Sequence, residues 1–338
     1  MLTARKRLAS SGDKIHGPWK QRVSFSAVLR LLVPGCGSLV AMTMTRRLLT
    51  VAGGRSLDVF VVGAEGAPLV VNLPGTPAGH VLFPSVEEAA ALAGIRIVSL
   101  ARPGYAGSTR LPGRTVADVV PDVLAVVDAL GVQCFAVVGT SGGGPHALAC
   151  GALAGDRCVA VSVVSGVGPW AAEGLDFLAG MGEGNEVEFG AALRGEAPLR
   201  ELLVPWREEM VSAGPDGTFA AMQSVLSPPD QEVFTGAVAE HLHESVSMAL
   251  NDGVDGWIDD DLAFTQSWGF DLANVRAPVF LWQGEQDLMV PPAHGRWLAD
   301  ALPICQARLL PDDGHLTVIL NRPGEVLADL AAALQNQD

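Results

Sequence analysis

Short, almost wholly apolar runs alternate with helical patterns along most of this chain, and this alternation limits the possible fold more than any other feature. Continuous apolar runs of this length are typical of parallel strands that helices cover on both faces. Six such runs lie at residues 68–73, 95–101, 134–139, 159–165, 278–284 and 306–311. The alternation therefore predicts an α/β fold with a doubly wound, mostly parallel sheet.

Two further strands are expected before the first of these runs. Residues 46–51 and 56–62 are predicted to form a hairpin whose turn is supplied by Gly53 and Gly54. Together with the six apolar runs, this hairpin brings the expected sheet to eight strands.

Two helices are clear in the first half of the chain. One is predicted over residues 85–93. The other spans residues 116–130, where valines recur at helical spacing after a capping box at Thr115 and Asp118. Pro121 falls inside this second pattern and is expected to cost a hydrogen bond or to kink the helix.

Residues 171–270 interrupt the alternation. They contain no clear strand and many helix formers, which predicts a helical cap inserted into an α/β core of residues 46–170 and 271–338. The cap holds 19 Asp and Glu against three Arg, and so accounts for the acidity of a chain whose formal charge is −15. The run Asp259-Asp260-Asp261 within it is expected to be a solvated loop.

The start of the chain differs from the rest in composition. Residues 1–47 carry nine Lys and Arg and a single acid, Asp13. Such a break marks a segment outside the folded unit, so residues 1–45 are predicted to be a leader or disordered extension, or an artefact of an upstream start codon. A signal peptide is disfavoured because Arg30 and Pro34 interrupt the apolar stretch.

Charge and cysteine content exclude several classes of protein. The negative charge argues against nucleic acid or an anionic membrane as a partner, since both need basic surface. The sequence contains no window of 18 uninterrupted apolar residues, so no membrane span is predicted. Five scattered cysteines, mostly inside apolar runs, predict buried free thiols and neither a disulfide framework nor a zinc site. We therefore expect a cytoplasmic protein.

A G-x-S-x-G motif, residues 139–143, follows one of the apolar runs directly and precedes an Ala-rich helix pattern. A nucleophile elbow needs this layout, because its serine sits on a strained turn at the end of a strand, and flanking glycines remove side chains that would collide with strand and helix. The motif alone is weak, and the strand–turn–helix context gives it weight. It nominates Ser141 as a nucleophile.

Two more residues complete a triad in the chain order serine, acid, histidine. Asp287 follows the run at 278–284, and His315 follows the run at 306–311. A hydroxyl near neutral pH is a weak nucleophile, so a base must take its proton during the attack. The pattern predicts His315 as this base and Asp287 as the acid that orients it toward Ser141.

The chain resembles the α/β-hydrolase family, which includes esterases, lipases, thioesterases and proline iminopeptidases, over about residues 46–334. Besides the triad motifs, residues 101–108 (ARPGYAGS) closely match the family's D-R-P-G-Y-G-x-S turn. Residues 74–77 (PGTP) occupy the place of its H-G-x-P oxyanion loop.

This resemblance implies that the backbone N–H groups of Thr76 and Gly142 bind the oxyanion. Pro74 stands where the family has a histidine, so the chain departs from the family's pattern within this loop. An aspartate at position 141 would have suggested epoxide or haloalkane hydrolysis, whereas serine implies acyl transfer to water.

Other polar residues near the motifs are expected to be structural. Loop, turn or helix-packing roles are assigned to Asp312, Asp313, His146, Arg102 and Tyr105, and Glu285 is out of register with the family's G-x-x-D pattern. His241 and His243 lie two apart, which on a helix points them in different directions and argues against a metal site. An apolar pocket lining, or packing of cap on core, is expected for Trp170, Trp206, Trp257 and Trp268.

The resemblance and the triad imply a serine hydrolase that cleaves an ester, thioester or amide of a small neutral substrate through an acyl-enzyme, with no metal or organic cofactor. One alternative is a proline-iminopeptidase-like enzyme whose cap carboxylates bind a substrate amine. Another is a hydrolase-fold protein that binds a ligand without turnover. The expected partner is a small-molecule substrate, and the oligomeric state is left open.

Overall fold

The computed structural model describes residues 19–23, 29–32, 39–42 and 44–336. Its main sheet consists of β1 (Trp19–Val23), β4 (Met44–Thr50), β5 (Ser56–Val62), β6 (Leu69–Leu73), β7 (Arg96–Leu100), β8 (Phe135–Thr140), β9 (Cys158–Val164), β10 (Val279–Gly284) and β11 (Cys305–Leu310). The strand order is β1-β4-β5-β7-β6-β8-β9-β10-β11. All eight predicted strands are present, which confirms the predicted doubly wound α/β sheet.

The six strands from β7 to the β11 edge are parallel to one another. Their carboxyl ends therefore meet at one edge of the sheet, where ligand sites of open α/β folds lie. The predicted hairpin is confirmed as β4 and β5, which pair antiparallel with each other and place β5 antiparallel to β7.

The sheet has one strand more than predicted. β1 pairs antiparallel with β4 and comes from the segment predicted to be a leader or disordered extension. The same segment also holds β2 (Leu29–Leu32) and β3 (Leu39–Met42), which pair with each other in a separate two-stranded sheet. Whether residues 1–45 serve as a leader stays a prediction.

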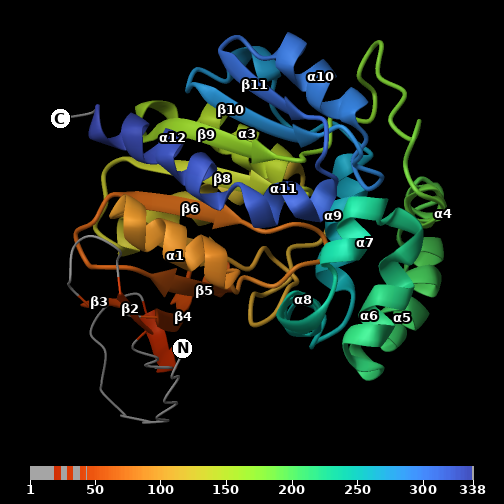
Figure 1. Cartoon of the computed structure of the whole chain (residues 1–338), viewed down its shortest axis with the longest axis horizontal. Helices are drawn as coiled ribbons and strands as arrows, with labels where there is room; N and C mark the ends of the chain where they lie inside the picture. The colour runs from red at the N-terminus through yellow and green to blue at the C-terminus, as the bar shows by residue number, and fades with distance from the viewer. Residues whose placement is uncertain (1–18, 24–28, 33–38, 43, 337–338) are drawn as a thin grey trace.

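Helices cover both faces of the sheet. α1 (Pro84–Ala93) and α12 (Pro323–Gln335) pack on the face toward the viewer in Figure 1, and α2 (Val119–Ala129), α3 (Gly143–Leu153) and α10 (Pro292–Ala301) pack on the other. In β9 all seven residues are buried because both faces of the strand are covered. Full burial of each valine side chain in β9 contributes about 1.5–3 kcal/mol to the stability of the fold.

The helix around Pro121 is less disturbed than predicted. A 3-10 turn at Val116–Asp118 comes first, and α2 begins at Val119, so Pro121 lies in the first turn of the helix. Amide groups in the first turn have no partner within the helix, and the missing N–H of proline costs nothing there. The capping box is confirmed, because the Thr115 backbone N–H and hydroxyl both donate to the Asp118 carboxylate.

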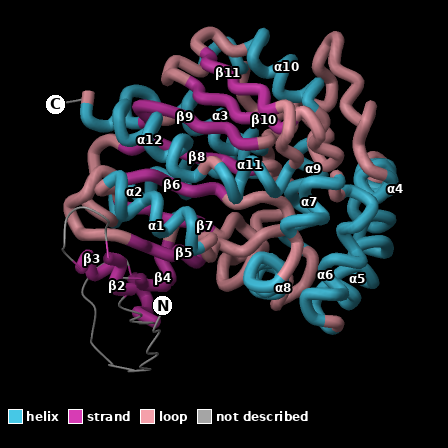
Figure 2. The backbone as a smooth tube through the Cα atoms, in the orientation of Figure 1, coloured by secondary structure: helices cyan, strands magenta, loops and turns pink. Residues whose placement is uncertain are grey.

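Residues 171–270, all of which the structure describes, contain no strand. We treat these residues as a cap; its division from the core stays a proposal. Its helices lie beyond the carboxyl ends of the parallel strands, at the right of Figure 2. They are α4 (Glu183–Ala192), α5 (Glu196–Ser212), α6 (Gly214–Met222), α7 (Pro228–Val233), α8 (Gly236–Ala249) and α9 (Asp255–Phe264).

The predicted solvated loop at residues 259–261 is wrong. Asp259, Asp260 and Asp261 lie within α9, and each is at most 2% exposed. Apolar residues on either side, such as Ile258, make this a helix buried between cap and core. Buried carboxylates need partners, which Arg110 supplies to Asp259 and which Arg102 and Arg114 supply to Asp260.

Candidate active site

Ser141 sits on a sharp turn between β8 and α3. Its φ of 52° lies in the left-handed region that L side chains rarely adopt. A Cβ on Gly139 would overlap the carbonyl oxygen of Gly143, and a Cβ on Gly143 would overlap that of Leu73. Strand, turn and helix therefore pass too closely for side chains at the flanking positions, as a nucleophile elbow requires.

His315 and Asp287 lie 28 residues apart in the chain, and their side chains are hydrogen-bonded to each other. The His315 Nδ1 atom lies 2.8 Å from Asp287 Oδ2, and both side chains are buried. The second carboxylate oxygen of Asp287 accepts from the backbone N–H groups of Met289 (2.9 Å) and Val290 (2.8 Å). These bonds fix the carboxylate where it can hold the imidazole in one orientation.

The surroundings of His315 favour its charged form. Burial alone would lower the pKa of the imidazole, but the charge of Asp287, its hydrogen bond to the ring, and the charge of Asp230 outweigh burial. The pKa of His315 is consequently raised above its ordinary value of 6.5. The ring is thus a stronger base than a free histidine.

Ser141 and His315 line one cavity of about 160 Å³. The cavity lies between the core and the cap, since its wall also includes Phe83 from the core and Leu242 and Val246 from α8. Apart from His315, none of its lining residues carries a titratable side chain. The structure therefore brings the predicted nucleophile and base to the same apolar space, with Asp287 behind the histidine.

The two residues expected to supply oxyanion N–H groups are neighbours. A Cβ on Gly142 would overlap the Thr76 side chain, and a Cβ on Gly75 would lie 3.3 Å from the Ser141 Cβ. The loop after β6 thus passes directly beside the start of α3. Thr76 also lines the cavity that holds Ser141.

Arg102 braces the loop of residues 74–77, which contains Pro74. The buried guanidinium donates to the carbonyl oxygen of Pro74, to that of Gly75 (2.9 Å) and to Thr76 Oγ1 (3.0 Å). The sequence predicts a structural role for Arg102 within its own turn. Its side chain instead reaches the neighbouring loop of residues 74–77.

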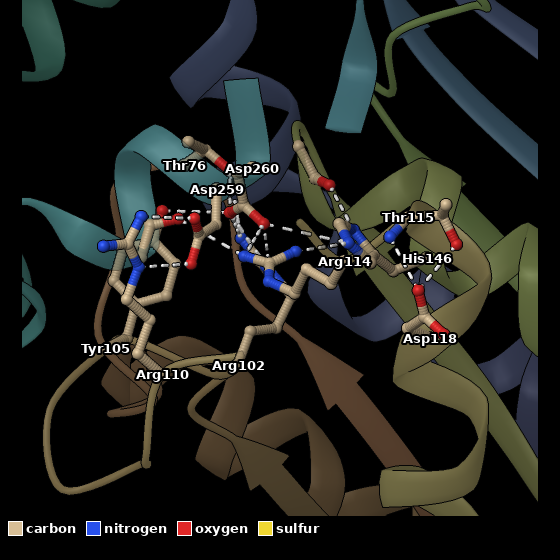
Figure 3. A network of polar contacts seen from close by, with 12 residues as sticks. Thr76, Arg102, Tyr105, Arg110, Arg114, Thr115, Asp118, His146, Asp259 and Asp260 are labelled. Carbon is tan, nitrogen blue, oxygen red and sulfur yellow. Dashed lines mark hydrogen bonds and ion pairs between the residues drawn. The ribbon is translucent and has the colours of Figure 1, made fainter. Parts of the chain in front are cut away.

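Asp260 on α9 is the centre of this network (Figure 3). Its carboxylate pairs with Arg102 and Arg114 and accepts hydrogen bonds from Thr76 Oγ1 (2.7 Å) and the Tyr105 hydroxyl (2.9 Å). Burial alone would raise the pKa of Asp260, but the two guanidinium groups outweigh it and hold that pKa well below its usual range. A charged carboxylate from the cap is therefore held against the loop of residues 74–77.

A second, smaller cavity of about 60 Å³ shares Ser141 and Thr76 with the first. Its wall includes two buried carboxyl groups, Glu188 on α4 and Asp261 on α9. Burial raises the pKa of both groups, and the charge of Glu188 raises that of Asp261 further. The two carboxyls place hydrogen-bonding oxygens close to Ser141.

Comparison with known families decides where this chain belongs. A sequence profile of the alpha/beta hydrolase family matches residues 69–330. The chain belongs to the alpha/beta hydrolase family. The match runs from the start of β6 into α12 and so includes Thr76, Ser141, Asp287 and His315 of this hydrolase.

Solved structures share the fold of this hydrolase over most of its length. A hydrolase from Pseudomonas aeruginosa PA01 is 19% identical with a TM-score of 0.61, covering 86% of this chain and 97% of that chain. An esterase from Exiguobacterium antarcticum is 14% identical with a TM-score of 0.62, covering 85% and 98%. An alpha/beta hydrolase fold protein from Nakamurella multipartita is 26% identical with a TM-score of 0.55, covering 87% and 100%. A search of curated proteins gave no match.

No helix in the described part of this hydrolase is both long and apolar enough to cross a membrane. In residues 19–23, 29–32, 39–42 and 44–336, no group of three or more His, Cys, Asp and Glu side chains is placed to hold a metal ion. The thiols of Cys134, Cys150, Cys158 and Cys305 are free, and Cys36 lies outside the described residues.

The remaining candidates have structural surroundings. Asp313 pairs with Arg322, and Glu285 pairs with Arg296. His146 lies behind the elbow in α3, where burial first and the Arg102 charge second lower its pKa to about 3, so it stays neutral. None of the four predicted tryptophans lines either cavity described above.

The two histidines of α8 point to different partners, as predicted. The His241 ring packs on Phe83, with ring centroids 4.2 Å apart. His243 Nδ1 lies 2.9 Å from Thr218 Oγ1.

Sequence reasoning missed four acidic residues of the cap that reach the site: Glu188, Asp230, Asp260 and Asp261. For the two on α9 a signal existed, because apolar residues flank the aspartates at helical spacing and argue for a buried helix. For Glu188 and Asp230 no sequence pattern indicates their partners, which come from distant segments.

Proposed function

We propose that this hydrolase is a serine esterase that cleaves esters of small neutral compounds through an acyl-enzyme. One observation carries the proposal: Ser141 and His315 share the wall of an apolar cavity, while His315 is bonded to the buried carboxylate of Asp287. The left-handed backbone at Ser141 further supports a role as nucleophile, because strained serines on such turns present their hydroxyl groups to substrate.

In the proposed reaction, the Ser141 hydroxyl oxygen attacks the substrate carbonyl carbon while His315 Nε2 takes the hydroxyl proton. Asp287, on Nδ1, holds the tautomer that leaves Nε2 free and favours the imidazolium that forms. The backbone N–H groups of Thr76 and Gly142 stabilise the negative charge that develops on the carbonyl oxygen.

Collapse of the tetrahedral intermediate breaks the ester bond, and the imidazolium gives its proton to the departing alcohol. Water then attacks the acyl-enzyme with His315 again as base, which releases the acid and restores the Ser141 hydroxyl. Every proton taken by His315 is returned in the same half-reaction.

The cavity that holds Ser141 and His315 favours a neutral substrate group of modest size. Its apolar wall offers no charged partner apart from His315, and burial of an unpaired charge there would be costly. A volume of about 160 Å³ is close to that of apolar cavities of roughly 150 Å³ that accept a benzene ring. Short alkyl or single-ring esters match this space.

A second candidate function is a proline-iminopeptidase-like aminopeptidase, favoured by the carboxyls of Glu188 and Asp261 beside Ser141. A substrate ammonium group would donate hydrogen bonds to such a pair and neutralise its charge. In that case the acyl part of the substrate carries an amine and the scissile bond is an amide.

Labelling with a fluorophosphonate probe tests the shared mechanism. We expect covalent labelling of the wild type and of Ser224→Ala, which changes an exposed cap serine, and none of Ser141→Ala. Absence of labelling in the folded wild type would favour a protein that binds without turnover.

Turnover assays then separate the two candidates. We expect the wild type to cleave p-nitrophenyl esters with short acyl chains faster than aminoacyl-naphthylamides. Amide turnover without ester turnover, lost in Glu188→Gln, would replace the esterase proposal with the aminopeptidase.

A further inference from the structure

The helix that begins at His315 is held by a carboxylate from the cap. α11 (His315–Asn321) starts at the proposed base, and its first backbone N–H groups point at Asp230 on α7. Asp230 Oδ2 accepts from the His315 N–H at 2.8 Å, and Oδ1 accepts from those of Leu316 at 2.8 Å and Thr317 at 3.1 Å. Asp230 itself is fully buried.

The contact is built closely on both sides. Ser227 Oγ donates to Asp230 Oδ2 at 2.7 Å and so orients the carboxylate. A Cβ on Gly314 would overlap both the Ser227 hydroxyl and the Asp230 carboxylate, so only glycine allows this approach. The apolar side chains of Leu226, Phe234 and Leu316 pack beside it and join cap to core.

We propose that Asp230 is a positioning residue that holds His315 in place for reaction with Ser141. The proposal rests on the proposed function, and it adds a role for the cap in assembling the general base. Two buried carboxylates then act on one histidine: Asp287 fixes the ring through Nδ1, and Asp230 fixes the backbone that carries the ring.

Position alone gives this contact a catalytic effect. The first N–H groups of a helix have no partners within it, and a carboxylate that accepts three of them fixes the start of the helix. Without Asp230 these N–H groups lose buried partners, and the turn before His315 relaxes to satisfy them. A shift of about 1 Å at a reacting group can cost about 100-fold in rate.

Charge adds a second, separable effect. Asp230 and Asp287 are the charged groups that act on His315. Glu232, also on α7, is exposed, and Glu285 and Asp313, which flank β10 and α11, are paired with Arg296 and Arg322. Removal of the Asp230 charge therefore makes the imidazolium less favourable and lowers the pKa of His315.

The test compares Asp230→Asn with Glu232→Gln, which removes an exposed carboxylate from the same helix. We expect Asp230→Asn to reduce kcat about 10- to 100-fold with KM within about twofold, since a displaced base impairs chemistry more than binding. The midpoint of its pH profile and that of the NMR titration of the His315 ring should both move to lower pH. Glu232→Gln should match the wild type in all three measurements.

A second variant guards against loss of folding. Asp230→Glu keeps the charge and moves the carboxylate by one methylene, so we expect wild-type titration of His315 and a kcat at least about fivefold lower. Unchanged His315 titration in Asp230→Asn, or wild-type kcat in Asp230→Glu, would overturn the proposal. The NMR titration needs no turnover, so it tests the role of Asp230 even if the protein has no esterase or peptidase activity. Absence of both activities would contradict only the proposed function.

Discussion

Arg102 and Asp260 form a buried ion pair directly beneath the loop that carries Thr76. One partner follows β7 in the core and the other lies on α9 in the cap, 158 residues later in the chain. The guanidinium has donors left over for the Pro74 and Gly75 carbonyls, so the pair braces the loop as well as joining cap to core. Five donors in a planar fork make arginine suited to this task.

Replacing Arg102 by lysine should therefore disturb the loop that carries Thr76, the proposed oxyanion donor. An ammonium cannot reach two carbonyls, a hydroxyl and a carboxylate in one plane, and we expect kcat for p-nitrophenyl acetate to fall about 100-fold with little change in KM. Arg110→Lys is the matched control, since Arg110 is partly exposed and pairs with Asp259 away from the loop. Equal kcat values for the two variants would contradict a bracing role.

Replacing Asp287 by asparagine should leave the fold intact but stabilise the wrong tautomer of the proposed base, His315. The amide favours the tautomer with its proton on Nε2, which cannot accept from Ser141, and we expect kcat to fall about 10⁴-fold. Asp312→Asn removes the charge of an exposed carboxylate in the loop before His315 and should retain wild-type activity. Steady-state ester hydrolysis distinguishes them, and comparable losses in both would mean that Asp287 is not the orienting acid.

The pH dependence of kcat/KM should follow His315. Activity needs the neutral ring and is lost as the pH falls through the pKa of His315, and since this pKa is raised, the midpoint should lie above 6.5. His146 does not contribute between pH 5 and 8, because its pKa is lowered to about 3. Hydrolysis of a neutral ester across this range gives the profile; a flat curve would argue against a histidine base.

Filling the larger cavity should shorten the acyl or alkyl groups that are accepted. Leu242 projects from α8 into the wall of this cavity, and Leu242→Trp adds bulk within its 160 Å³. We expect kcat/KM for p-nitrophenyl hexanoate to fall about 10-fold or more, while that for the acetate stays within about twofold. A uniform loss across the acyl-chain panel would place the substrate group elsewhere.

Glu87 on α1 should make stability depend on pH for a reason unrelated to catalysis. Burial raises the pKa of its carboxyl from 4.5 to about 7, so the folded state binds this proton more tightly than the unfolded state. The folded state therefore loses stability as the pH rises from about 4.5 to about 7. We expect the stability gain of Glu87→Gln in urea unfolding to grow by about 2 kcal/mol between pH 5.5 and 8.5. Glu88→Gln, at an exposed position, should have a constant effect.

Local patterns were sufficient to predict the strands of the core and the residues of the proposed triad. The apolar runs are read from a few neighbouring residues, and the motif at Ser141 combines with strand ends to place Asp287 and His315 at one edge of the sheet. Each of these sequence signals lies within a short segment. A parallel strand that is covered on both faces, for example, consists of a continuous run of apolar residues.

Long-range partners decided the rest. Nothing near Asp230 in the chain indicates that it will bind the backbone of His315, and nothing near Asp260 indicates two arginines and a threonine from the core. A buried carboxylate is tolerated only where donors converge on it, and these donors come from segments far apart in the chain that meet only when the cap packs on the core. Sequence periodicity records which residues are buried, whereas the partners of a buried charge are set by packing.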